Sequence, residues 1–310
     1  MLLKARPTAT QLADRLRPPL PEGLELYLDI ADISEEGWLE AILGRIAGYE
    51  LPADFAWVVE GPLRSLDGAF FNPARDVEAD REVLRRIVAC GERLGARAVV
   101  IHCIAPTANG GELTKANRER VMATAERTFT YYADLCQQHG LVPTIENVPP
   151  VARMRESAFV HSLIGMSPQD MVYFTDRVPG LMAVCDTSHA QLYVNAATAE
   201  AAAQPAALAP IVAYLAELPS VGSLAEYIAT LGARIFEAHV ANAAGLLDEG
   251  LPYDTGDADL AAAVQALSGT ACYLATEPLE PEPEKAERMR AMAKWLMAQR
   301  ARSDCEGKQA

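Results

Sequence analysis

The sequence lacks the features that would assign the chain to a membrane or to an oxidising compartment. No apolar run approaches the roughly 18 residues of a membrane span, and the first residues contain no apolar core of secretory length. The six cysteines of this 310-residue chain are widely scattered and form no C-x-x-C pair. This usage is typical of reduced thiols in a protein core. We therefore expect a cytoplasmic protein that does not bind membranes.

Positive charge is also scarce, because 27 Lys and Arg face 42 Asp and Glu, for a formal net charge of −15. A surface of this sign repels phosphate backbones, so nucleic acid is a disfavoured partner. No G-x-G-x-x-G or P-loop pattern occurs, which removes the usual signal of a doubly wound nucleotide-binding fold. No Pro/Ser linker divides the chain. We expect a single domain over residues 1–300 and a disordered tail over 301–310.

What the sequence does contain is one local pattern that recurs seven times. Each copy has five mostly apolar residues followed by Asp, Glu or His, and the copies cover 24–29, 55–60, 97–102, 141–146, 181–186, 234–239 and 272–277. Short runs of this kind are typical of strands buried on both faces of a parallel sheet. Helical stretches separate the copies, and two of these stretches end at Gly95 and Gly140, as helices commonly do.

Alternating strands and helices predict parallel βαβ units. With residues 2–5 as a short first strand there are eight units, which favours a (β/α)₈ barrel over an open sheet, with the active site at the C-terminal ends of the strands. Residues 191–232, between the fifth and sixth copies and so between the sixth and seventh strands, exceed the length that one barrel helix requires. They predict a helical insertion that serves as a lid or an oligomer contact, with a solvated Ala-rich segment as the alternative.

In such a barrel the last residues of the repeats would form a ring around one mouth. Four consecutive repeats end in Glu146, Asp186, His239 and Glu277. Three carboxylates and one imidazole suit Mn²⁺, Mg²⁺ or Co²⁺ and are acceptable to Zn²⁺. A single strand-end acid usually caps a helix or pairs with Arg, but four such residues in one register favour a metal site. We expect one divalent ion there, with Mn²⁺ as the first choice.

Other polar and aromatic residues near the predicted mouth carry more than one interpretation. His102 either binds substrate, joins Glu60 and Glu146 around a second metal, or is a hydrogen-bonded histidine of the barrel. Glu237 lies two residues before His239, so both side chains are on the same face of their strand. Glu237 is therefore predicted to point inward, where it needs a partner or a proton. Two aromatic residues, Phe70 and Phe71, lie on a loop above the mouth. They either stack on a sugar ring or pack the loop down.

The segments VVIHC, PTIENVP, VCDTSHA, FEAHVAN and ATEPLE, in this order, resemble the xylose isomerase-like barrel superfamily over residues 20–300. That superfamily includes sugar isomerases and epimerases, inosose and dehydroshikimate dehydratases, and apurinic endonucleases. In its ketose 3-epimerase branch, a Glu, an Asp, a His and a Glu hold a single metal. The resemblance implies this role for Glu146, Asp186, His239 and Glu277, and it implies that His189 binds a substrate hydroxyl.

Departures from the superfamily narrow this expectation. Glu60 stands where the nucleases carry a metal-binding histidine, and the turn at 248–250 reads DEG where they carry Asp-x-His. This chain therefore lacks two histidines that the nucleases need for their three-metal cluster. Asn242 replaces a common Asp, and no Arg follows His239 within eight residues. The resemblance therefore does not identify the substrate.

The predicted site supports chemistry next to a carbonyl. A divalent cation that binds a carbonyl and its neighbouring hydroxyl makes the α-proton more acidic. Glu146 and Glu277 lie three strands apart and would remove and deliver protons on opposite faces of the substrate. We expect an isomerase or epimerase that acts on a polyhydroxylated small molecule, with homo-oligomerisation left open. A lyase is the alternative, whereas a non-catalytic sugar-binding barrel and a nuclease are disfavoured.

Overall fold

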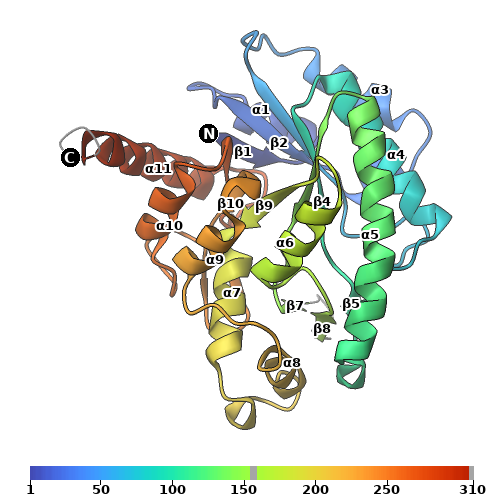
Figure 1. Cartoon of the computed structure of the whole chain (residues 1–310). Helices are drawn as coiled ribbons and strands as arrows, with labels where there is room; N and C mark the ends of the chain where they lie inside the picture. The colour runs from blue at the N-terminus through green and yellow to red at the C-terminus, as the bar shows by residue number, and fades with distance from the viewer. Residues whose placement is uncertain (154–158, 307–310) are drawn as a thin grey trace.

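The computed structural model describes residues 1–153 and 159–306, and its centre is a closed barrel of eight parallel strands (Figure 1). The barrel strands are β1 Leu2–Ala5, β2 Gly23–Tyr27, β3 Ala56–Glu60, β4 Ala98–His102, β6 Val142–Glu146, β9 Met182–Asp186, β10 Ile235–Val240 and β13 Tyr273–Thr276. Each strand pairs in parallel with the next one in this order, and β13 closes onto β1. The predicted barrel is confirmed, and the open sheet is wrong.

Helices connect the strands and surround the barrel (Figure 1). Outside the segment between β9 and β10 they are α1 Ala9–Arg15, α2 Ile30–Ile33, α3 Trp38–Ile46, α4 Glu78–Leu94, α5 Lys115–Gln138, α6 Pro168–Arg177, α10 Leu260–Leu267 and α11 Glu287–Glu306. Gly95 ends α4 with a φ of 65°, a backbone conformation that glycine adopts without strain. No helix in the described part of the chain is long and apolar enough to cross a membrane.

The segment between β9 and β10 is helical, as its composition predicts. It contains α7 Thr187–Thr198, α8 Ala209–Leu215 and α9 Leu224–Leu231, with short 3₁₀ turns at Ala201–Ala203 and Gly232–Arg234. The Tyr214 hydroxyl of α8 donates to the Leu163 carbonyl at 3.1 Å, and the Tyr227 hydroxyl of α9 donates to the Met166 carbonyl at 3.0 Å. Both helices are thus tied to the loop that precedes α6. The role of this segment as a lid stays a prediction.

Small antiparallel sheets extend the loops that follow three of the barrel strands. The first contains β5 Pro106–Thr107, β7 Val151–Arg153 and β8 Phe159–Ser162, and the second is a hairpin of β11 Asn242–Ala244 and β12 Asp248–Leu251. They follow the C-terminal ends of β4, β6 and β10. The loops at that end of the barrel are therefore held in place by their own hydrogen bonds.

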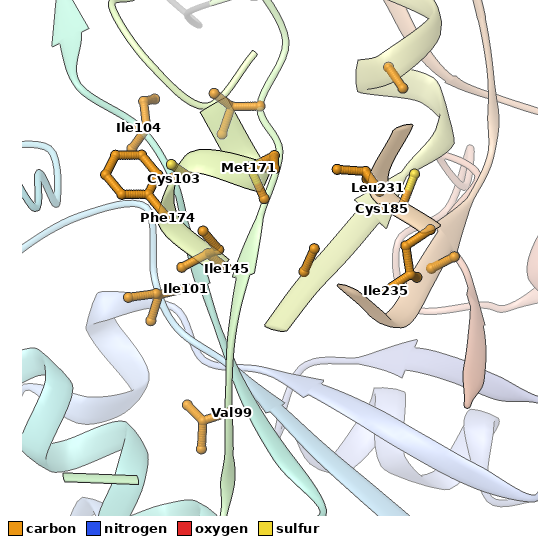
Figure 2. Close-up of a cluster of buried hydrophobic side chains, with 14 of the residues drawn as sticks. Val99, Ile101, Cys103, Ile104, Ile145, Met171, Phe174, Cys185, Leu231 and Ile235 are labelled. Atoms are coloured by element: carbon orange, nitrogen blue, oxygen red, sulfur yellow. The ribbon is translucent and has the colours of Figure 1, made fainter. Parts of the chain in front are cut away.

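Apolar side chains fill the space between the strands and the surrounding helices. Figure 2 shows part of this core, in which Val99, Ile101 and Ile145 from the strands lie with Met171 and Phe174 of α6. All five side chains are at most 2% exposed. These residues occupy the outward-facing positions of their strands, so a different set of residues points into the lumen.

The lumen itself has two levels. Its lower level, toward the N-terminal ends of the strands, is one apolar cluster of Leu2, Ala56, Val58, Ala98, Val100, Val184, Phe236 and Ala275, which we call the apolar layer. Above it, toward the C-terminal ends, the inward positions carry charged groups and histidines. This second level, which we call the upper level, contains the candidate site.

Two expectations about where elements end are corrected by the structure. Strand β2 ends at Tyr27, and Asp29 instead caps α2, accepting a hydrogen bond from the Ala31 amide at 3.1 Å. Asp29 therefore does not belong to the polar ring, because its carboxylate satisfies the first turn of a helix. Helix α11 continues to Glu306 where a tail from residue 301 is expected, and residues 307–310 lie outside the described residues.

Candidate active site

The four residues expected to bind a metal come together at the upper end of the lumen. Glu146, Asp186 and His239 occupy the ends of β6, β9 and β10, and Glu277 directly follows β13. One possible ligand atom from each residue lies within 4.8 Å of the others. The first three residues are at most 2% exposed, while the Glu277 side chain is 28% exposed. The cluster is therefore buried below and open on the side of Glu277.

The imidazole of His239 lies at the centre of this cluster. Its Nδ1 atom lies 2.9 Å from Glu277 Oε2 and 3.3 Å from Glu146 Oε1. Among the described residues, His239 Nδ1, Glu277 Oε2 and Glu146 Oε2 are buried without a hydrogen-bond partner. Buried polar atoms are rarely left in this state. Oxygen and imidazole donors that face one another without satisfying one another fit a divalent cation.

Charges within the protein shift the pKa values of this cluster strongly. Burial alone would raise the pKa of Glu146, but the positive charges of His239 and His102 lower it to about 2. The pKa of Asp186 is raised to about 7, mainly by burial, against the opposing effect of His189. Burial disfavours the charged form of His239, yet nearby carboxylates raise its pKa well above the usual value. The site is built to hold positive charge among its carboxylates.

The motif VCDTSHA shows why these side chains are held so firmly. Asp186 ends β9 and also caps α7, since its Oδ1 accepts a hydrogen bond from the His189 amide at 2.7 Å. The Asn147 side chain joins β6 to β9, donating to the Asp186 carbonyl at 3.0 Å and accepting from the Asp186 amide at 2.7 Å. The helix cap and the metal-site interpretations of Asp186 are therefore compatible, because the cap uses one carboxylate oxygen.

Lys4 on β1 is a member of the site that the sequence analysis missed. Its ammonium lies 2.6 Å from Glu60 Oε2 and also donates a hydrogen bond to Glu277 Oε1. Burial opposes the charge of Lys4, but Glu277 and Glu60 raise its pKa well above the usual value. Lys4 therefore holds the oxygen of Glu277 that faces away from His239. The alternation of side chains along a strand could have revealed it, because Leu2 and Lys4 occupy successive inward positions of β1.

Glu60 and His102 lie beside the four-residue cluster. The Nε2 atom of His102 is 3.3 Å from Glu60 Oε1 and 3.4 Å from Glu146 Oε2. These three residues form a second group whose ligand atoms lie within 4.8 Å of one another. The ion pair between Lys4 and Glu60 already supplies a positive charge on one side of this group. A role for Glu60 and His102 in substrate binding stays a prediction.

His189, at the start of α7, faces the site from above the strand ends. Its Nδ1 atom lies 2.9 Å from the Asn147 carbonyl oxygen and 3.5 Å from Glu146 Oε1. Its Nε2 atom is 3.5 Å from Glu249 Oε2 on the hairpin strand β12. The sequence offered no signal for Glu249, because the path of a hairpin over the mouth does not follow from strand periodicity.

Two further carboxylates lie at the bottom of the upper level of the lumen, next to the apolar layer. Glu25 on β2 and Glu237 on β10 are both 0% exposed, and they form a group with His239 whose polar atoms lie within 4.8 Å of one another. Glu237 points inward as its parity predicts, and within the described residues neither of its oxygens has a hydrogen-bond partner. Burial, followed by repulsion from Glu25, raises its pKa well above the usual value. This shift favours the protonated form of Glu237, which is one of the two predicted alternatives.

The loop after β3 places its two phenylalanines differently. Phe71 is 1% exposed and belongs to the hydrophobic core, so it packs the loop down and presents no ring to a substrate. Phe70 is partly exposed, and the Arg64 guanidinium lies 3.9 Å from its ring centroid. The interpretation of the pair as a platform for a sugar is therefore wrong for Phe71.

A cavity of ≈ 210 Å³ adjoins the open side of the cluster. Its lining includes Lys4, Arg6, Tyr27, Glu277, Leu279 and Met289. The cavity thus begins at Glu277 and extends over the ends of β1 and β2. It offers space for part of a small molecule beside the four-residue cluster.

The fold and this geometry define a class of protein: a (β/α)₈ barrel with a carboxylate–histidine cluster at the C-terminal mouth that could hold a cation. The family described as "Xylose isomerase-like TIM barrel" matches residues 23–299, and the chain belongs to this family. No curated protein sequence matches the chain significantly.

Three of the solved structures similar to this chain align with it over at least 96% of both chains. A D-tagatose 3-epimerase-like protein is 16% identical, with 97% of this chain and 99% of that chain covered and a TM-score of 0.66. An L-ribulose 3-epimerase is 16% identical, with 98% and 97% covered and a TM-score of 0.60. The 3-keto-D-glucoside 4-epimerase YcjR from E. coli is 11% identical, with 96% and 98% covered and a TM-score of 0.62. At these identities the likeness establishes the fold.

Proposed function

We propose that the chain is a divalent-metal-dependent isomerase or epimerase that moves a proton next to the carbonyl of a sugar or related polyhydroxylated ketone. The observation that carries this proposal is the set of unsatisfied ligand atoms on Glu146, His239 and Glu277 beside Asp186. Membership of the xylose isomerase-like family supports it, and so do the names of the similar structures, which are epimerases of ketoses and of a keto-glucoside.

Glu146, Asp186, His239 and Glu277 would hold the ion, and their donor set suits Mn²⁺ best among the candidates. When bound, a divalent cation would polarise the substrate carbonyl and acidify the neighbouring C–H. The rest of the chemistry falls to side chains of this chain.

Glu146 and Glu277 are the groups that would move the proton. Each has one oxygen near His239 Nδ1 and a second oxygen elsewhere, near His102 for Glu146 and in contact with Lys4 for Glu277. The second oxygen of Glu146 has no hydrogen-bond partner in the described structure, so it is free to accept a proton. The second oxygen of Glu277 shares its charge with the Lys4 ammonium, which makes Glu277 the weaker base of the two.

The remaining residues would bind and orient the substrate. His189 reaches over the cluster from α7, and His102 with Glu60 lines its inner side. We assign hydroxyl groups of the substrate to these three side chains, since imidazole and carboxylate pair well with hydroxyls. The cavity beside Glu277 would take the distal end of the molecule.

The test combines metal analysis with proton exchange. The purified protein should contain or bind one divalent ion per chain, and it should catalyse exchange of an α-proton with D₂O on one member of a panel of ketoses and keto-inositols. Exchange with inversion or isomerisation is the expected result. Exchange with loss of water would instead indicate a lyase. A protein that binds no divalent ion and exchanges no proton would refute the proposal.

A further inference from the structure

The Nε2 atom of His239, on the side away from the candidate metal ligands, has one strong partner. It lies 2.8 Å from Glu25 Oε1, and both residues are 0% exposed. Nδ1, on the other side of the ring, faces Glu146 and Glu277. The ring is thus clamped between a buried carboxylate on β2 and the cluster at the mouth.

This arrangement fixes which nitrogen carries a hydrogen when the other one binds a cation. A neutral imidazole donates from one nitrogen and offers a lone pair at the other, and an ionised carboxylate can only accept. A hydrogen bond between Nε2 and an ionised Glu25 carboxylate therefore requires the hydrogen on Nε2. The lone pair is then left on Nδ1, which points at Glu146 and Glu277.

We propose that Glu25 is a positioning residue that orients His239 and fixes its Nδ1 lone pair toward the metal site. The inference rests on the proposed metal binding, and it adds a residue that lies outside the four ligands. Carboxylates that accept from a ligating histidine act in this way in metal sites generally, by fixing the tautomer and raising the basicity of the ligand.

The burial of Glu25 supports this role. Its other oxygen, Oε2, has no hydrogen-bond partner among the described residues, so the bond to His239 is the main compensation for burying the carboxylate. In register, Glu25 lies beside Lys4 on one strand and Val58 on the other. Glu25 therefore stands at the border of the apolar layer, where an apolar side chain would be buried without this cost.

The first experiment measures the affinity for Mn²⁺ and Zn²⁺ by calorimetry in the wild type and in Glu25→Gln and Glu25→Leu. We expect a loss of about 10- to 100-fold, the range found when such outer partners are removed. The loss should be larger for Leu, which cannot accept a hydrogen bond. Glu237→Gln is the matched control, because Glu237 is equally buried and close to His239 but makes no hydrogen bond to it. Its affinity should equal that of the wild type.

The second experiment reads the tautomer directly in the wild type and compares it with a Glu25 variant. Protein labelled with ¹⁵N-histidine and loaded with Zn²⁺ should show His239 with a protonated Nε2 and a metal-bound Nδ1 in the NMR spectrum. In folded Glu25→Leu, which has no acceptor for the Nε2 hydrogen, this pattern should be lost or mixed with the other tautomer.

The outcomes separate this inference from the proposed function. A wild type that binds Zn²⁺ through Nε2 of His239, or Glu25 variants that keep full affinity, would overturn the inference and leave metal binding intact. An equal loss of affinity in Glu237→Gln would also overturn it, since the effect would then follow from any change in the buried carboxylates. A wild type that binds no divalent ion would overturn both.

Discussion

The lower and upper levels of the barrel lumen are built by the same strands, yet they differ completely in chemistry. On β1, Leu2 lies in the apolar layer and Lys4 in the level above it; on β4, Val100 and His102 have the same relation. One step of two residues along a strand changes the lumen from hydrocarbon to charge. The apolar layer seals the barrel from below, so the groups above it meet solvent only through the mouth.

This contrast indicates which part of the lumen serves stability and which part serves chemistry. Burying apolar side chains stabilises the fold, whereas burying carboxylates disfavours it unless they are paired. The upper level carries six carboxylates, those of Glu25, Glu60, Glu146, Asp186, Glu237 and Glu277. Lys4 and the histidines offset them only in part, and a bound cation would complete the compensation.

The largest effect should come from two glutamates of the upper level, Glu146 and Glu277. Glu146→Gln and Glu277→Gln each replace a carboxylate by an amide that can still ligate a metal but cannot accept a proton. Loss of one general base typically lowers turnover by about 10² to 10⁴-fold. Steady-state kinetics on the substrate found by the D₂O screen would measure this, with circular dichroism to confirm the fold.

The two variants should also differ from each other. If the enzyme is an epimerase, each variant should still exchange the α-proton of one stereoisomer with solvent, because the opposite base remains. In a lyase, one variant would lose exchange and the other would exchange without expelling the leaving group. Full activity in both variants would limit the glutamates to metal binding and would move the proton transfer to His102 or His189.

The second effect concerns the ion pairs of Lys4. In Lys4→Met the buried Glu60 and the partly buried Glu277 lose their shared cation. Removing one partner of a buried pair commonly lowers the free energy of unfolding by about 3–5 kcal/mol. Urea denaturation would measure it, and Lys294→Met, at an exposed position of α11, is the control with an expected change below about 0.5 kcal/mol. Equal stability of the two variants would show that Lys4 contributes no net stabilisation.

The third effect belongs to the apolar layer. Val100→Ala removes two methyl groups from a side chain that is 0% exposed, which should lower the free energy of unfolding by about 2 kcal/mol. Metal affinity should not change, because Val100 lies one level below the ligands. A clear loss of metal affinity in this variant would mean that the two levels are mechanically coupled.

The barrel and its four-residue cluster could be predicted because both depend on local periodicity. Repeated apolar runs ending in Asp, Glu or His indicate parallel strands, and parallel strands of a barrel end at one mouth. Glu146, Asp186 and His239 therefore fell into one register before any contact was known. Glu237 followed from the same parity rule.

Other parts of the site did not follow from this rule as it was applied. The rule considers only the last residue of each repeat, so it assigns Asp29 to the ring at the mouth. In the structure, β2 ends two residues earlier and its inward carboxylate is Glu25. Lys4 was missed because residues 2–5 carry no copy of the repeat, so the rule marked no polar residue on β1. Glu249 depends on the path of a hairpin, which is set by tertiary contacts and not by the local pattern.

The smallest effect concerns Glu237, at the border between the two levels, and it appears as a pH dependence. The pKa of Glu237 is raised well above its usual value by burial and by Glu25, so the folded protein keeps this proton while the unfolded chain releases it above pH of about 4.5. Unfolding therefore releases a proton, and stability should fall as the pH rises from that value toward the folded pKa. The slope is at most about 1.4 kcal/mol per pH unit.

Glu237→Gln stays neutral at every pH and removes this contribution, so its free energy of unfolding should fall less steeply between pH 5 and 8 than that of the wild type. Urea titrations of both metal-free proteins across this range would measure the difference. If the two proteins lose stability with pH at the same rate, Glu237 is already ionised in the folded state. Glu237 would then belong with the charged groups of the upper level.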